Sequence, residues 1–226
     1  MALLAATALF AWRVGVSAWE KVGTQLEKDR RVLSAHQLLQ EQIASMVPYE
    51  AWTQQGGRAV FFQGEPQTAR FVSRSSLAYR AASGLFLIEY HVTVQADGTR
   101  QLLLRETPVR GNAELGAMVA AIESDPGGFR LRLPAFERDA ETVILLEGLR
   151  ECRFEYFRLT PNAQPGGELG SWTDEWVGRA DEVPPAMRIR AVAPSAAGEL
   201  APVTIVAAVR NFARWKQPGP LGIFGL

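Results

Sequence analysis

Residues 88–104, IEYHVTVQADGTRQLLL, decide the fold class of this chain. Over 88–94 apolar residues alternate with polar ones, which is the period of a strand with one buried face. Asp97-Gly98 then gives a turn signal, and the alternation resumes over 102–104. An Asp-Gly step between two alternating runs predicts an antiparallel hairpin.

Further short runs of this kind lie on both sides of the hairpin. Earlier strands are predicted at 60–62 and 69–72, joined across Gly64-Glu65-Pro66. Later strands are predicted at Phe129–Leu133, Val143–Leu146, Cys152–Tyr156, Met187–Ala191 and Val203–Val209. The last run is apolar on both faces, which is typical of a central strand. Between these runs only Ala113–Glu123 predicts a helix.

The first 47 residues have a helical pattern instead. Met1–Trp12 carries no charge, and an apolar stripe at helical spacing then continues past Leu26 and Leu39 until Pro48 ends it. A helix over 1–47 would be about 70 Å long, more than a core of this size needs. Its uncharged start is about half of a membrane span. We expect one end to lie in lipid or among like helices and the other to pack on its own domain.

These patterns predict an α+β fold, with a long amino-terminal helix packed on a mainly antiparallel β domain. The expected parts are a helix at 1–47, a β-rich globular domain at 48–212 and a tail at 213–226. The helix would serve as a partial membrane anchor and then as an amphipathic stalk.

Composition excludes several classes of function. The 226 residues include 24 Lys and Arg and 24 Asp and Glu, so the formal net charge is zero. Such a chain lacks the basic footprint of a nucleic-acid binder. One cysteine, Cys152, and two histidines, His36 and His91, are too few for a zinc site. We expect Cys152 on a buried strand face and His91 on an exposed one, with no cofactor and no metal.

The search for catalytic motifs finds no active site. The serines near Arg74 and Arg80 have no base nearby and predict a solvated loop; they are Ser73, Ser75 and Ser76. One acidic group surrounds Trp176 and consists of Asp174, Glu175, Asp181 and Glu182. It could be read as a glycosidase pair or as a set of calcium ligands, but its spacing matches neither template. We therefore expect that the protein is not an enzyme.

The order of these features resembles a known family. The first stretch is LLAATALFAWRVGVSAWEKV (3–22) with QLLQEQIASMVP (37–48). The second joins VFFQGEPQTARFVS (60–73) to SGLFLIEYHV and RQLLLRETP. The third joins LLEGLRECRFEYF (145–157) to Trp172 and Trp176, then to VPPAMRIRAV and PVTIVAAV. In this order they resemble the J-type minor pseudopilins of type II secretion systems, a branch of the type IV pilin-like proteins.

One part of the family pattern is missing. The family begins with a basic leader, a cleavage site and a Phe-Thr-Leu-(Leu/Ile)-Glu run, whereas Met1 falls inside the apolar pattern. We expect that the sequence lacks its true beginning and that about ten apolar residues precede Met1. No residue here matches the family's cleavage, amino-terminal methylation or docking glutamate.

The resemblance implies a structural role in protein secretion. It implies a single-pass protein of the bacterial inner membrane whose globular domain lies in the periplasm, at the tip of a pseudopilus. Its partners would be the I-like and K-like minor subunits and the major pseudopilin, without nucleic acid or a small-molecule substrate. The expected membrane and helix-packing residues are Leu3, Leu4, Leu9, Phe10 and Val14.

Three alternatives stay open at this point. A minor pilin of a type IV pilus or DNA-uptake machine would share the anchor helix. A membrane-anchored periplasmic binding or hydrolase domain would use the acidic loop around Trp176. A soluble α+β protein would use the first helix as part of its core.

Overall fold

The chain divides into two units, Met1–Gln37 and Leu38–Leu226. The computed structural model describes Arg30 and residues 32–52, 57–79, 82–125, 128–160, 169–178, 182–192 and 202–210. In the first unit, Arg30 and residues 32–37 are helical. The predicted anchor at the start of the chain lies outside the described residues, and within them no helix is long and apolar enough to cross a membrane.

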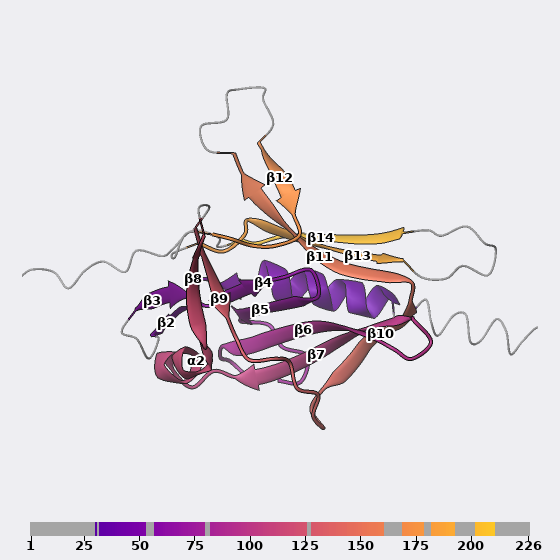
Figure 1. Cartoon of the computed structure of the whole chain (residues 1–226). Helices are drawn as coiled ribbons and strands as arrows, with labels where there is room; N and C mark the ends of the chain where they lie inside the picture. Colours follow the sequence, from indigo (N-terminus) through magenta and orange to yellow (C-terminus); the bar gives the residue numbers. More distant parts are fainter. Residues whose placement is uncertain are drawn as a thin grey trace, which may run out of the picture. The chain divides into compact units, whose positions relative to one another are not determined.

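Among its described residues, the second unit contains two antiparallel sheets of four or more strands and two separate two-stranded hairpins (Figure 1). The larger sheet has the order β1-β5-β6-β7-β10, and β4 also pairs with β5. Its strands are β1 (Met46–Val47), β4 (Phe62–Gly64), β5 (Thr68–Ser73), β6 (Phe86–Val94), β7 (Arg100–Pro108) and β10 (Val143–Leu149). The smaller sheet has the order β12-β11-β13-β14. Its strands are β11 (Glu151–Leu159), β12 (Gly170–Thr173), β13 (Ala186–Val192) and β14 (Pro202–Ala208).

The hairpin predicted from 88–104 is confirmed as β6 and β7, which pair over nine residues from Phe86↔Pro108 to Val94↔Arg100. Gly98 has a φ of 81°, a left-handed conformation that glycine adopts without cost. The carboxylate of Asp97 accepts hydrogen bonds from the backbone N–H (2.9 Å) and hydroxyl (2.6 Å) of Thr99. Both residues of the Asp-Gly step therefore stabilise the turn, Asp97 by its hydrogen bonds and Gly98 by its backbone conformation.

In the second unit, residues 38–44 are helical. Leu39 and Ile43 are fully buried, as the apolar stripe predicts. The helix ends earlier than expected, because Ser45 forms a turn and Met46–Val47 pair with β5 as strand β1. The predicted helix end at Val47 is therefore wrong by about one turn.

A chain of aromatic rings fills the core between these elements. Phe62 contacts Tyr156 edge-on at a centroid distance of 5.8 Å and Trp176 at 6.3 Å. Tyr90 contacts both Phe71 and Phe154 at 6.1 Å. These contacts join both sheets, and such pairs add about 0.5–1.5 kcal/mol each beyond area burial.

A second apolar cluster lies around helix α2 (Asn112–Met118). It includes residues of two hairpins, β2 (Glu50–Trp52) with β3 (Arg58–Val60) and β8 (Ala121–Asp125) with β9 (Gly128–Arg132). The predicted helix at Ala113–Glu123 is thus correct only in its first half. Its second half begins β8, whose partner β9 was predicted correctly.

The described structure confirms a mainly antiparallel α+β fold. One strand prediction is wrong in its placement. β14 pairs only with β13 among the described strands, and Val206 on it is 48% exposed, so it is an edge and not a central strand. The apolar residues on its solvent-facing side led to the prediction of a central strand.

Candidate functional site

The predicted membrane and helix-packing residues cannot be placed in the structure. Leu3, Leu4, Leu9, Phe10 and Val14 all lie outside the described residues. The hypothesis of an apolar anchor therefore stays a prediction.

The acidic loop around Trp176 is organised for packing. Trp176 is buried against the aromatic core, and its backbone N–H donates to the carbonyl of Gly64 at 3.0 Å. Glu175 pairs with Arg130 at 2.8 Å, and Asp174 is exposed. Asp181 lies outside the described residues, and the part of the chain that is described holds no group of three potential metal ligands. A buried tryptophan cannot serve as a platform for a sugar ring.

His91 differs from its predicted place. We expected an exposed residue, but Phe136 stacks on its ring at 4.9 Å, and Thr68 Oγ1 lies 3.0 Å from its Nδ1. Burial lowers the pKa of His91, and the nearby charge of Arg70 lowers it further, whereas Glu65 raises it. The side chain is therefore neutral at pH 7 and covered by a segment that the strand pattern did not reveal.

The serines predicted to form a solvated loop are part of a buried network. Ser73 is fully buried and donates to the carbonyl of Gln42 at 2.9 Å. Ser76 donates to Glu106 at 3.0 Å, and the backbone N–H groups that follow, at Leu77 and Ala78, donate to the same carboxylate at 2.8 and 2.7 Å. The prediction was wrong because these hydroxyls satisfy buried partners on distant elements. The same network holds the helix, since the side chain of Gln42 contacts both Glu106 and Tyr90.

A row of charged and polar side chains crosses the larger sheet on the face opposite to Tyr90 and Glu106. The register places Gln63 beside Arg70, Arg70 beside Glu89 and Glu89 beside Arg105 on four consecutive strands. Arg105 donates to Glu89 through Nε at 2.7 Å. Arg70 Nε lies 2.9 Å from Glu89 Oε1 as an ion pair, although its N–H is not aligned for a hydrogen bond.

The row is sealed by residues 134–139. Arg70 donates to the carbonyl of Pro134 at 2.8 Å, and Arg105 donates to that of Glu137 at 2.9 Å. Burial lowers the pKa of Arg70, an effect that Glu89 opposes and Arg105 reinforces. Burial also lowers the pKa of Arg105, but the hydrogen bond and charge of Glu89 outweigh it and raise the pKa overall. The charged row is therefore tied to residues 134–139, which cover it.

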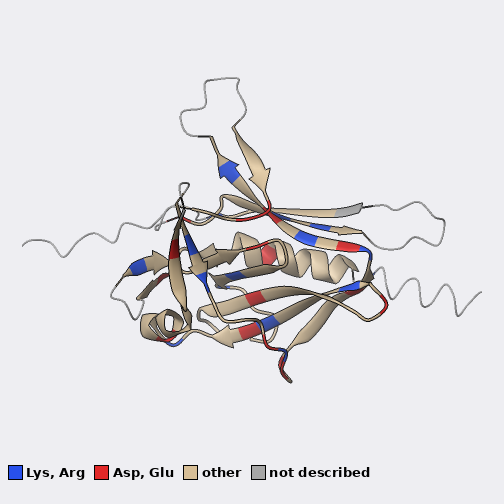
Figure 2. Cartoon of the chain, in the orientation of Figure 1, with Lys and Arg blue, Asp and Glu red and all other residues tan. Residues whose placement is uncertain are grey.

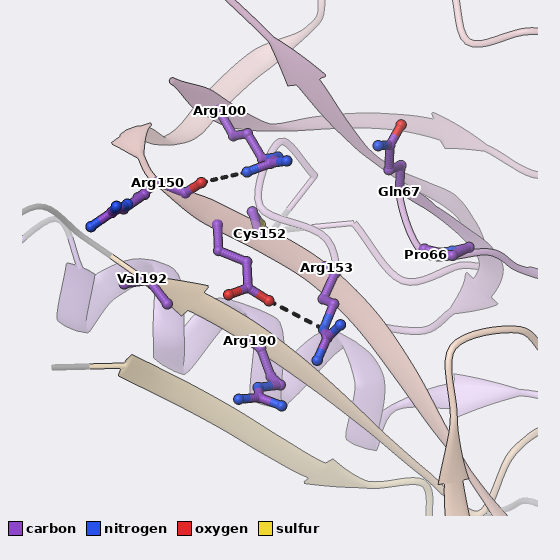
Figure 3. A pocket seen from close by; sticks show the side chains of 9 residues that line it. Pro66, Gln67, Arg100, Arg150, Cys152, Arg153, Arg190 and Val192 are labelled. Atoms are coloured by element: carbon purple, nitrogen blue, oxygen red, sulfur yellow. Dashed lines mark hydrogen bonds and ion pairs between the residues drawn. The ribbon is translucent and has the colours of Figure 1, made fainter. Parts of the chain in front are cut away.

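An open pocket of about 650 Å³ lies where the two sheets meet (Figure 3). Four arginines line it: Arg100 at the start of β7, Arg150 between β10 and β11, Arg153 on β11 and Arg190 on β13. Among the described residues, one carboxylate, that of Glu151, lines the pocket with them, so the formal charge of the described lining is +3. This excess stands out in a chain whose net charge is zero.

The pocket is held by backbone contacts between the sheets. Arg100 donates through its guanidinium to the carbonyl of Arg150, and the N–H of Arg150 donates to Val192 at 2.8 Å. The carbonyl of Pro66 accepts a hydrogen bond from the backbone N–H of Phe154 at 2.9 Å. This bond fixes the turn between β4 and β5 to strand β11. The arginines are therefore carried by firmly connected strands.

Two of these arginines face each other across neighbouring strands. Arg153 and Arg190 are direct register partners, an arrangement that is destabilising for like charges. Glu155 lies between them, 3.3 Å from Arg153 and 4.0 Å from Arg190, and it also pairs with Arg188. Figure 2 shows this mixture of basic and acidic residues on β11 and β13. Arg153 also pairs with Glu151 at 3.3 Å, so among the described residues two carboxylates face three arginines and balance their charge only in part.

Cys152 also lines the pocket but is not a reactive group. Its side chain is 3% exposed, which confirms the buried face predicted for it. Burial raises the pKa of its thiol to about 12, although the charge of Arg100 lowers it. Since the thiolate is the nucleophile, the chemistry of this pocket is that of the guanidinium groups, which bind carboxylates and phosphates.

Sequence reasoning missed this pocket for a definite reason. Each arginine lies on a polar face or strand end that alternation alone assigns to solvent. Only the register of β11 with β13, and the approach of β7 to their ends, brings the four together. The R-x-R pattern of Arg188 and Arg190 indicated a basic face on one strand. It did not indicate which arginines of other strands lie beside that face.

Comparison with known protein families and with curated proteins found no match for this chain.

Proposed function

We propose that the chain is a minor pseudopilin of a type II secretion system, resembling subunit J. In this role it is a non-enzymatic assembly subunit of a periplasmic pseudopilus. Its amino-terminal segment anchors it in the inner membrane and packs among the helices of neighbouring subunits.

The observation that carries the proposal is how residues 38–44 enter the globular unit. Leu39 and Ile43 are fully buried, and Gln42 hydrogen-bonds inside the core. A helix with one end docked in this way, preceded by the uncharged Met1–Trp12, is what an anchored subunit needs. Such a subunit needs no catalytic group.

The carboxy-terminal stretches that carry the resemblance support the proposal, because they coincide with core elements. LLEGLRECRFEYF covers most of β10 and β11, and PVTIVAAV covers β14. VPPAMRIRAV leads into β13, whose Met187 and Ile189 are fully buried. The shared pattern therefore concerns residues that determine the sheet, as expected for a family defined by its fold.

Deletion of the gene in its own bacterium tests the proposal. Secreted enzymes should accumulate in the periplasm and disappear from the medium, and the full chain supplied in trans should restore them. Normal secretion with loss of surface pili or DNA uptake would identify the type IV pilus role instead. Normal secretion and normal pili would contradict both assembly roles.

A further inference from the structure

We propose that the arginine pocket, lined by Arg100, Arg150, Arg153 and Arg190, binds an extended acidic segment of another protein through its carboxylates. The proposal concerns this pocket alone and holds whether or not the chain belongs to a pseudopilus.

The guanidinium groups have unused capacity. Each arginine carries five N–H donors in a planar fork that suits a carboxylate. Within the described part of the chain, no ion pair involves Arg150, and its side chain is exposed. In the described part of the chain, the carboxylate paired with Arg190 is that of Glu155, 4.0 Å away, and the Arg190 side chain is 40% exposed. Donors of the pocket therefore face solvent and are open to an incoming anion.

The arrangement of the arginines fits a row of carboxylates better than one anion. Arg150 directly precedes β11 and Arg153 lies on it, three residues further along, so their backbones are separated by up to about 10 Å in an extended chain. Arg190 lies beside Arg153 on the next strand. A single carboxylate or phosphate spans only a few ångströms and cannot reach all of them. Alternate side chains of an extended peptide are spaced by about 7 Å and can.

Other classes of ligand fit the lining less well. A small metabolite needs a site that buries most of its surface, whereas Arg153, Arg190 and Glu151 are each about 40% exposed. Single-stranded nucleic acid is held by aromatic platforms, and the described lining of this pocket contains no aromatic side chain. Several flexible arginines on an open rim are suited to a polyanionic protein segment.

Fluorescence anisotropy with a fluorescein-labelled octaglutamate peptide tests the proposal. The full chain is purified in an uncharged detergent and titrated at low ionic strength. We expect saturable binding that weakens as salt rises, because exposed charges are screened. Arg150→Glu should weaken binding by at least about fivefold, which corresponds to about 1 kcal/mol. Octaglutamine should not bind.

Matched variants separate the pocket from general charge. Arg138→Glu makes the same charge change at an exposed site outside the pocket and should alter binding by less than about twofold. Arg190→Gln is the second test, since it keeps side-chain length and does not reverse charge. Circular dichroism should show that each variant is folded. If Arg150→Glu does not fold, the result with Arg190→Gln decides.

Three outcomes would overturn the proposal. The first is equal peptide binding by wild type and the folded pocket variants. The second is binding of inorganic phosphate or of vesicles containing phosphatidylglycerol without binding of the peptide. The third is binding that Arg138→Glu weakens as much as Arg150→Glu. None of these outcomes bears on secretion or on assembly with other pseudopilins.

Discussion

Glu89 shows how single residues decide the stability of the larger sheet. Its side chain is 1% exposed and is held between Arg70 and Arg105. Burying charges is costly, but leaving one of them without its partner costs more. The sequence shows these residues only as polar positions of alternating strands, so the row could not be predicted before the register was known.

Glu89→Gln should destabilise the protein by about 3–5 kcal/mol, because it leaves the buried Arg70 without its counter-charge. The free energy of unfolding in urea measures this loss. Glu141→Gln, at an exposed position, should change the value by less than about 0.5 kcal/mol. Equal effects of the two substitutions would contradict the assignment of Glu89 as a buried ion partner.

Cys152 should resist alkylation in the native protein. With a pKa raised to about 12, only about one thiol in ten thousand is ionised at pH 8. Iodoacetamide should therefore modify Cys152 slowly at pH 8 and rapidly after unfolding in guanidinium chloride, as mass spectrometry would show. Equal rates in the two states would show that Cys152 is accessible and not buried.

His91 should make stability depend on pH on the acid side of neutrality. Its folded pKa lies below the ordinary 6.5, so the unfolded chain binds the proton more readily. Its contribution is complete above about pH 6.5 and is lost as the pH falls through the folded pKa. His91→Gln should reduce the loss of unfolding free energy between pH 7.5 and 5.5. An unchanged slope would show that His91 titrates alike in both states.

At the scale of elements, close backbone contact fixes α2. Gly116 is buried in this helix, and a Cβ built there would lie 1.6 Å from the carbonyl oxygen of Trp52 on β2. A backbone atom cannot rotate away as a side chain can. The approach of α2 to β2 therefore requires glycine.

Gly116→Ala should destabilise the protein by about 3 kcal/mol, because α2 must move away from β2. The midpoint of thermal unfolding, compared with wild type, measures this effect. Gly111→Ala is the matched control, since a Cβ there meets no atom within 4 Å and the φ of 172° is ordinary extended backbone. If both variants unfold with the wild-type midpoint, the close packing of α2 is wrong.

The elements also show where sequence reasoning succeeds and where it stops. Alternation together with Asp97-Gly98 predicted the β6–β7 hairpin, because both signals are local. The start of α2 was found, but its end was placed five residues too late, since 121–125 pairs with β9. The edge position of β14 depends on strand order in space, which local periodicity does not contain.

At the scale of the whole molecule, a net charge of zero hides uneven local charge. Glu89 lies in a sealed row, whereas the arginines of the pocket lie on an open rim. The balanced counts of basic and acidic residues argued against nucleic-acid binding. They could not reveal a basic pocket, because a net charge does not say where the charged residues lie. The proposed role as a minor pseudopilin also concerns the whole molecule, because it requires assembly with other chains.

Light scattering on the purified full chain mixed in detergent with its I-like and K-like neighbours tests that claim most directly. We predict a stable heteromer of micromolar affinity or better, which corresponds to about −8 kcal/mol or stronger. The measured mass should equal that of one copy of each subunit after subtraction of the detergent. Three separate monomers at tens of micromolar would contradict the assignment as the J-type subunit.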